Sequence, residues 1–403
     1  MSELRQAGTT KFFVSLESLR GLAALVVVVY HAVWSNPITE LHFFQNGALM
    51  VDFFFVLSGF VIFHSYGRRL TNSPQIIRFL WLRVGRLYPL HLAFLLVFLA
   101  FEVAKFIAEK HLGIVADKPA FTVNNGFSFA TNLLLIHSLG LHHSLTYNYP
   151  SWSISTEFYA YVLFAAVRSL CREDRKFVIV AVLVVAVSAA TLLIAKIPFL
   201  SSAGVDWGFF RCCGGFFIGV LTYYAYCSIR TLRWYSNANM GWNTWLSPLA
   251  LSATIAFLAL VNPEGRWTYL FPLFSAFCIL TVVLWPNLLV GNLLSATPLR
   301  WLGQVSYSLY MVHAAVVWSM TQVLTVVFKF PKTVVVDGHG VGTPLGIGFI
   351  VLVGYIAVVF ALSNATYHRI EDPFRKRSRE LAARWFTTGM GTLGSANAAI
   401  KES

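Results

Sequence analysis

Three charged or basic residues share one face of a strongly apolar segment near the start of the chain. Segment 16–31 reads LESLRGLAALVVVVYH and carries Glu17, Arg20 and His31. Arg20 and His31 are eleven residues apart, so a helix places them on one face, roughly 16 Å apart along its axis. A polar stripe is costly in a bilayer and must face protein or water, which predicts a functional site. The alternative is a Glu17–Arg20 ion pair at the membrane edge, with His31 packed near the other end.

Two arginines one helical turn apart form a second candidate site. Arg83 and Arg86 stand in FLWLRVGRLYP, where a basic segment runs into a long apolar stretch. Arginine binds phosphates through a planar, bidentate fork of donors. We therefore predict a phosphate-binding site here, whereas Arg68 and Arg69 in the preceding loop are interpreted as topology signals.

An acidic residue stands near the start of a third apolar segment. In WSISTEFYAYVLFAAV, Trp152 opens the segment and Glu157 precedes the uninterrupted apolar run. Glu157 is suited to orienting an imidazole or binding a hydroxyl group, or alternatively to capping its helix, where a negative charge is favoured. Trp152 is predicted either to stack on a sugar ring or to belong to the interfacial aromatic belt.

Further polar residues inside apolar segments are candidates for a supporting network. Asp52 stands in MVDFFFVLSGF, Arg211 in WGFFRCCGGFFIG, and Tyr307, Tyr310 and His313 follow helical spacing in SYSLYMVH. The simpler interpretations are hydration of Asp52 near the outer end and snorkelling of Arg211 to the interface. The tyrosine–histidine stripe favours a buried network with satisfied hydrogen bonds.

Other reactive residue types give no metal, disulfide or nucleophile prediction. His137, His142 and His143 fit no single helix face, so no metal site is predicted from them. The five cysteines lie in or beside apolar stretches without metal-ligand spacing and are interpreted as small packing residues. Ser58, in the tripeptide LSG, lacks the flanking glycines of a nucleophile elbow.

The composition places these residues in a membrane protein. Hydrophobic residues make up 57% of the 403 residues and charged residues 12%, against about 25% charged in average soluble domains. The net charge of +13 lies in short loops and does not indicate nucleic-acid binding. Most of the ten apolar runs are long enough to cross a hydrocarbon layer of about 30 Å as helices. These runs are 14–34, 47–66, 87–107, 153–171, 176–196, 206–227, 244–261, 267–285, 303–328 and 344–364.

The distribution of Lys and Arg predicts the orientation of an all-α polytopic protein. Ten spans put both termini on one side, which carries 21 of the 30 Lys and Arg residues, against 7 on the opposite side. By the positive-inside rule both termini are cytoplasmic. The predicted division is a cytoplasmic N-terminus (1–13), a transmembrane domain (14–366) and a basic cytoplasmic tail (367–403), frayed from residue 376.

The outer loop 108–150 contains the longest stretch outside the predicted spans. Its apolar patch, Phe127 to Ile136, is too short to cross a bilayer alone. We interpret this patch as a re-entrant or interfacial segment.

Six motifs occur in a fixed order over roughly residues 13–375: LESLRGLAALVVVVYH, FFFVLSGFVI, FLWLRVGRLYP, WSISTEFY, SYSLYMVH and IEDPF. Together they resemble the membrane-bound acyltransferase 3 family of bacterial sugar O-acyltransferases. The resemblance implies a ten-helix fold in the bacterial inner membrane, and no permanently bound cofactor. It implies a cytoplasmic acyl-coenzyme A donor, with acetyl as the expected acyl group, and an extracytoplasmic or lipid-linked carbohydrate acceptor.

The resemblance also implies roles for particular residues. Arg20, His31 and Glu157 would form the catalytic set, and Arg83 and Arg86 would bind coenzyme A. An acyl-histidine relay and direct attack both stay open. The acceptor or supporting network is expected to comprise Asp52, Trp152, Arg211, Tyr307 and His313.

A transporter or translocase of a lipid-linked sugar, without covalent chemistry, is the alternative function class. It would share intramembrane charges and broken helices, but would more often show internal repeats. The sequence contains no convincing repeat, which favours the enzyme. The sequence predicts no oligomeric state.

Overall fold

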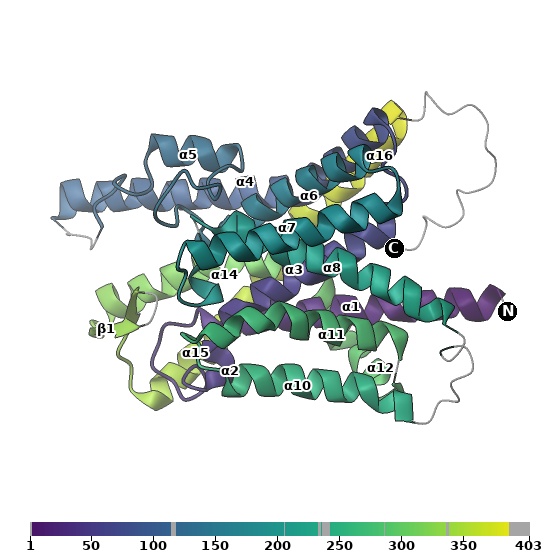
Figure 1. Cartoon of the computed structure of the whole chain (residues 1–403). Coiled ribbons are helices and arrows are strands. Elements are labelled where there is room, and N and C mark those ends of the chain that lie inside the picture. Colours follow the sequence, from purple (N-terminus) through teal and green to yellow (C-terminus); the bar gives the residue numbers. More distant parts are fainter. Residues whose placement is uncertain are drawn as a thin grey trace.

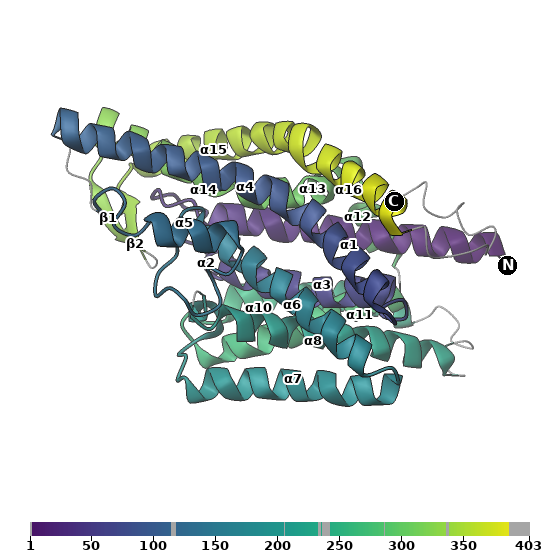
Figure 2. The same cartoon turned by 90° about the horizontal axis from the view of Figure 1, so that it is seen from above.

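Long helices run side by side through the whole structure. The computed structural model describes residues 2–113, 118–204, 206–232, 235, 242–285, 287–335 and 338–386. Figures 1 and 2 show the resulting bundle from two directions. Within these residues the strands are β1 (Lys332–Val335) and β2 (Gly338–Val341), which pair antiparallel with Lys332 opposite Val341.

The α-helices, in chain order, are α1 (Ser2–Tyr30), α2 (His42–Gln45), α3 (Met50–Tyr66), α4 (Ser73–Leu112), α5 (Gly126–Leu133), α6 (Trp152–Leu170), α7 (Asp174–Ile194), α8 (Gly208–Thr231), α10 (Leu246–Leu260), α11 (Phe271–Leu284), α12 (Leu288–Leu294), α13 (Thr297–Gln304), α14 (Ser306–Gln322), α15 (Leu345–Thr366) and α16 (Asp372–Phe386). Short 3-10 turns are η1 (Gly47–Leu49), η2 (Tyr149–Ser151), η3 (Leu200–Ser202), η4 (Trp242–Trp245) and η5 (Arg266–Leu270). Two π-helical turns are η6 (Val323–Val327) and η7 (Tyr367–Glu371).

The described residues contain seven helical stretches that are long and apolar enough to cross a membrane. They are Gly47–Tyr66, Ser73–Leu112, Asp174–Ile194, Gly208–Thr231, Arg266–Leu284, Ser306–Val327 and Leu345–Phe386. The three other predicted runs fall on α1, α6 and α10, and α10 has 15 residues. The chain is therefore an integral membrane protein built as a helical bundle, while ten spans and cytoplasmic termini stay predictions.

Helix α4 is longer than the apolar run from which it was predicted. It begins at Ser73, where the Asn72 side chain accepts a hydrogen bond from Gln75 N at 3.1 Å, and it continues through Pro89. Arg83 and Arg86 consequently lie within one continuous helix, one turn apart.

The C-terminal segment is helical as far as Phe386, so the expectation of fraying from residue 376 is wrong up to that point. Helix α15 continues through η7 into α16, which packs against α4. Trp81 Nε1 donates to Ser378 O at 3.0 Å, and a Cβ on Gly85 would overlap the Ser378 side chain. Residues 387–403 lie outside the described part of the chain.

Small residues allow α3 and α8 to touch backbone to backbone. A Cβ on Gly59 would overlap the Phe216 carbonyl, and a Cβ on Gly219 would overlap the Val56 carbonyl. Close helix approach through glycine is a common way to pack helices in membranes. This crossing fixes the two helices that carry Asp52 and Arg211.

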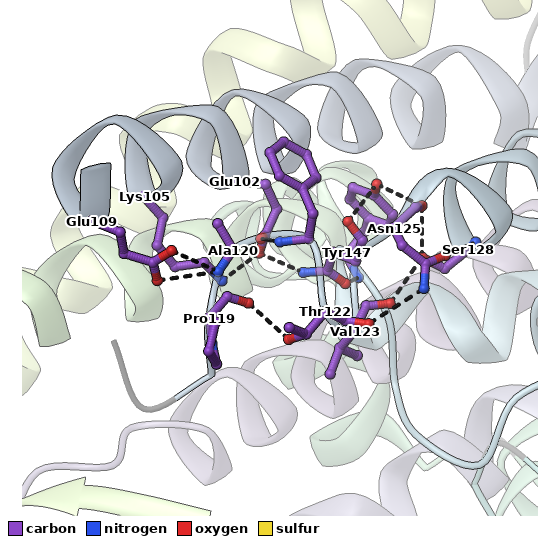
Figure 3. A network of polar contacts seen from close by, with 12 residues as sticks. Glu102, Lys105, Glu109, Pro119, Ala120, Thr122, Val123, Asn125, Ser128 and Tyr147 are labelled. Atoms are coloured by element: carbon purple, nitrogen blue, oxygen red, sulfur yellow. Dashed lines mark hydrogen bonds and ion pairs between the residues drawn. The ribbon is translucent and has the colours of Figure 1, made fainter. Parts of the chain in front are cut away.

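The segment between α4 and α6 is attached to the C-terminal end of α4 by a polar network (Figure 3). The Glu102 carboxylate accepts from Lys105 Nζ at 2.9 Å, Phe121 N at 3.0 Å and Asn124 Nδ2 at 2.8 Å. Tyr147 N donates to Asn124 Oδ1 at 2.6 Å. These bonds hold the segment that leads into η2 and α6.

The predicted apolar patch 127–136 overlaps α5, which packs against α4 (Figure 1). Tyr88 Oη donates to Leu133 O at 3.0 Å. Whether this segment re-enters the membrane stays a prediction.

Candidate active site

One cavity inside the bundle gathers polar residues from motifs that are far apart in the sequence. Its volume is about 210 Å³, and its wall contains Arg20 from α1, Arg83 and Arg86 from α4, and Glu157 from α6. Apolar side chains of α3 line another part of the wall, among them Val51, Phe54, Leu57 and Val61. The cavity thus combines a cationic wall with an apolar one.

Arg20 is held in place by the junction of α13 and α14. Its Nε donates to Ser306 Oγ at 2.9 Å and its Nη2 donates to Gly303 O at 3.0 Å. Helices α1 and α13 approach closely, because a Cβ on Gly21 would lie 2.5 Å from Gly303 N. In the described residues this junction, and not an ion pair with Glu17, fixes the Arg20 side chain.

Arg83 and Arg86 supply guanidinium donors to the cavity. Arg83 Nη2 donates to Tyr66 Oη at 3.3 Å, and the Arg83 guanidinium lies 5.3 Å from the centre of that ring. Its Nε is buried and makes no hydrogen bond within the described residues. The Arg86 guanidinium makes no side-chain hydrogen bond and no ion pair within 4 Å in the same part of the chain, although the buried Glu371 carboxylate is close enough to attract it. Both groups therefore retain donors that an anionic ligand can use.

Glu157 belongs to a chain of hydrogen bonds rather than to a helix cap. Tyr161 Oη donates to Glu157 Oε1 at 2.5 Å, and Tyr161 Oη lies 2.9 Å from Ser58 Oγ. Tyr161 and Ser58 also line the cavity. Sequence reasoning missed Tyr161, although its position four residues after Glu157 puts the two on one helix face.

Asp52 and Arg211 form a buried ion pair, so hydration of Asp52 and snorkelling of Arg211 are both wrong interpretations. Arg211 Nε donates to Asp52 Oδ1 at 2.9 Å and Arg211 Nη2 to Asp52 Oδ2 at 2.7 Å, with both side chains 1% exposed. The Arg211 guanidinium also lies 5.3 Å from the Trp152 ring centre. The pair connects α3 to α8, and Trp152 packs on it from the start of α6.

His31 lies immediately after α1, outside the wall of the cavity. Its Nδ1 is 2.9 Å from Val27 O, which can only accept, so the neutral ring carries its proton on Nδ1 and has a basic Nε2. The ring centre lies 4.9 Å from that of His313 and 5.1 Å from that of Tyr149. Arg20, within α1, lines the cavity, whereas His31, just after the end of α1, belongs to a separate cluster with His313 and Tyr149.

The predicted tyrosine–histidine network forms only in part. Tyr307 Oη donates to Leu87 O at 2.5 Å, and Tyr310 Oη donates to Pro150 O at 3.0 Å. Both tyrosines line the cavity, and the Tyr310 ring centre lies 5.7 Å from that of His313. His313 is fully buried, but neither ring nitrogen has a hydrogen-bond partner in the described residues. For His313 the expected side-chain network does not form, and the nearby polar groups are the backbone carbonyls of Leu309 and Tyr310.

The histidines of the segment between α4 and α6 contact different partners. His137 Nε2 lies 3.2 Å from Ser151 Oγ, and burial lowers the pKa of His137 to about 3. His142 Nε2 lies 2.7 Å from Thr131 Oγ1. In the described part of the chain, no group of three or more His, Cys, Asp or Glu residues could hold a metal ion.

Comparison with known proteins identifies a family and several relatives that cover most of the chain. The family model described as an acyltransferase domain matches residues 13–364. "Protein 2 in picA locus" of Rhizobium radiobacter is 34% identical over 203 residues, which cover 46% of this chain and 96% of that protein. The putative peptidoglycan O-acetyltransferase YrhL of Bacillus subtilis is 26% identical over 91% of this chain and 55% of its own length.

A third relative is the peptidoglycan O-acetyltransferase OatA of Listeria monocytogenes, 23% identical over 91% of this chain and 56% of its own length. The chain thus spans just over half the length of these two O-acetyltransferases. No solved structure matches the chain. Because the family model covers nearly the entire helical bundle, the chain belongs to this acyltransferase family and is a membrane-embedded acyltransferase.

Proposed function

We propose that the protein is an O-acyltransferase. It moves an acyl group, acetyl in the simplest case, from cytoplasmic acyl-coenzyme A to a hydroxyl of an extracytoplasmic or lipid-linked carbohydrate. The observation that carries the proposal is the cavity with Arg20, Arg83 and Arg86 on its wall and with Tyr310 between this wall and the His31–His313 pair. The names of the relatives YrhL and OatA support O-acetyl transfer to a cell-wall carbohydrate.

The donor fits the cavity as an extended arm rather than as a whole nucleotide. A volume of about 210 Å³ is below the ~300–1,000 Å³ typical of pockets for drug-sized ligands. Arg83 and Arg86 would bind the phosphates, and the apolar wall from α3 would pack along the acyl-bearing arm. The bacterial cytoplasmic membrane, with α4 beginning on the cytoplasmic side, is the location consistent with this arrangement.

The transfer step needs a base because a hydroxyl is a poor nucleophile at neutral pH. The basic Nε2 of His31 would remove the hydroxyl proton. Arg20 would position the donor or stabilise the developing negative charge. Glu157, hydrogen-bonded to Tyr161, would orient the acceptor. Direct attack and an acyl-histidine relay use the same groups.

The competing proposal is a sugar translocase without covalent chemistry, and one experiment separates the two. Purified protein in detergent is mixed with acetyl-coenzyme A and with a carbohydrate fraction from the producing cells. An acyltransferase releases free coenzyme A and acetylates the carbohydrate, whereas a translocase does neither. Mass spectrometry of surface polysaccharide from deletion and complemented strains then identifies the acceptor.

A further inference from the structure

His313 is the polar side chain of the bundle that most needs an explanation. It is 0% exposed, and neither Nδ1 nor Nε2 makes a hydrogen bond of normal geometry in the described residues, although the backbone carbonyls of Leu309 and Tyr310, one turn earlier in α14, lie close to the ring. Leaving a buried polar group unpaired costs about 1–3 kcal/mol, so such groups in native structures usually have a structural or functional reason. A ligand that supplies the missing bonds is one such reason.

His313 lies beside His31, the proposed base, and next to Tyr310, which lines the cavity. Its ring centre is 4.9 Å from that of His31, 5.7 Å from Tyr310 and 6.1 Å from Tyr149. Tyr310 lines the cavity, and its hydroxyl donates a hydrogen bond to Pro150 O. These three side chains are the titratable groups in ring contact with His313 among the described residues. Neither histidine lines the cavity, so a thioester would have to extend past Tyr310 to approach the two imidazoles.

We propose that His313 is a second catalytic histidine, which donates a ring N–H to the thioester carbonyl oxygen as negative charge develops there. This inference rests on the proposed function. His31 Nε2 takes the proton from the acceptor hydroxyl while the hydroxyl oxygen bonds to the carbonyl carbon. The carbonyl oxygen becomes an oxyanion held by His313. Its collapse breaks the carbon–sulfur bond, and the thiolate takes the proton from His31.

A donor role suits His313 better than a second base. Two protonated imidazoles with ring centres 4.9 Å apart would repel each other, so one of the pair stays neutral while the other carries the proton. A neutral imidazole always retains one N–H, and a preorganised donor in a water-excluded site stabilises developing charge strongly. His31 already commits its Nδ1 proton to Val27 O, which leaves His313 as the donor.

The test compares His313→Leu and His313→Gln with the parent chain. Inverted membrane vesicles from the producing cells receive acetyl-coenzyme A labelled in the acetyl group, and label in the polysaccharide is measured. We expect kcat to fall about 10²–10³-fold in His313→Leu, the usual cost of losing one oxyanion donor. The dissociation constant of coenzyme A should not change. His313→Gln keeps an N–H donor and should retain clearly more activity than His313→Leu.

The matched control is His91→Gln, which alters another buried histidine. His91 is 1% exposed and hydrogen-bonds Asn132 O through Nε2 at 2.9 Å, away from the cavity wall. If His313→Leu keeps the kcat of the His91→Gln control, or if His313→Gln is as inactive as His313→Leu, the inference is wrong. An inactive parent chain would instead contradict the proposed function. Thermal unfolding in detergent confirms that each variant folds, and His313→Gln decides the test if His313→Leu does not fold.

Discussion

Asp52 in α3 and Arg211 in α8 are joined by two hydrogen bonds of 2.9 and 2.7 Å although they stand 159 residues apart in the sequence. The pair is almost fully buried and lies beside the glycine crossing of the same two helices. Arg211 also donates to Ala48 O at 3.0 Å. The ion pair therefore fixes α3, which forms the apolar wall of the cavity, against α8.

Removing one partner of this pair should destabilise the protein strongly. Asp52→Asn leaves the Arg211 guanidinium without its counter-charge, and such a loss costs about 3–5 kcal/mol. The double variant Asp52→Leu/Arg211→Met should lie closer to the parent, because no buried charge stays unpaired. Thermal unfolding in detergent measures the stability of the parent, of Asp52→Asn and of the double variant. A single variant as stable as the parent would show that the pair does not hold α3 to α8.

The second prediction concerns donor binding by Arg83 and Arg86. Each Arg→Lys change keeps the charge but removes the planar fork, so each should weaken coenzyme A binding. Equilibrium binding of coenzyme A to purified protein provides the measurement. Arg78→Lys, on the exposed face of the same helix, should bind as the parent does. If Arg83→Lys and Arg86→Lys both bind coenzyme A as the parent does, these arginines do not bind its phosphates.

The third prediction tests the crossing that positions Arg20. A Cβ on Gly303 would lie 2.5 Å from Glu17 O, so Gly303→Ala must push α1 away from α13. Overpacking of this kind costs about 1–3 kcal/mol, and transfer activity should fall because Gly303 O and Ser306 Oγ also orient Arg20. Gly291→Ala in α12, where a Cβ meets nothing within 4 Å, is the control. Equal activity of the two variants would contradict the positioning role of the crossing.

The fourth prediction concerns orientation in the membrane. Single cysteines at the exposed positions Thr71 and Thr122, in a chain whose five cysteines are replaced, are exposed to a membrane-impermeant thiol reagent on intact cells. The positive-inside rule predicts labelling at position 122 and protection at position 71. The reverse pattern would invert the topology and put the donor site on the outside.

Local periodicity predicted the site residues that lie on one helix, but not contacts between distant helices. The spacing of Arg83 and Arg86 placed them on one face of α4, and the cavity contains both. The Asp52–Arg211 pair could not be inferred, because nothing local relates residues of α3 and α8. The contact of Tyr161 with Glu157 could have been predicted, because the two residues are four positions apart on one helix. The surroundings of the His313 ring could not, because they depend on the residues that pack around it.

Helix α16 does not follow from the sequence prediction, because the basic residues of this segment favour a frayed cytoplasmic tail. The segment is amphipathic: Ala382 is buried, Ser378 meets α4, and the Trp385 ring lies 5.0 Å from Trp81. The apolar spacing in DPFRKRSRELAARWF was the available signal. The predicted limits of the spans were also too narrow, because hydropathy marks only the apolar part of a helix. Helix α4 extends beyond its apolar part at both ends.

The most direct test of the account is acyl transfer by His31→Gln, since this change retains bulk and a hydrogen-bonding group but removes the base. Inverted vesicles receive labelled acetyl-coenzyme A, and labelled polysaccharide is compared with that from the parent at equal protein levels. Loss of a general base lowers the rate about 10²–10⁴-fold, and the account predicts a loss in this range with normal membrane insertion. A normally inserted His31→Gln protein that transfers acetyl at nearly the parental rate would contradict it.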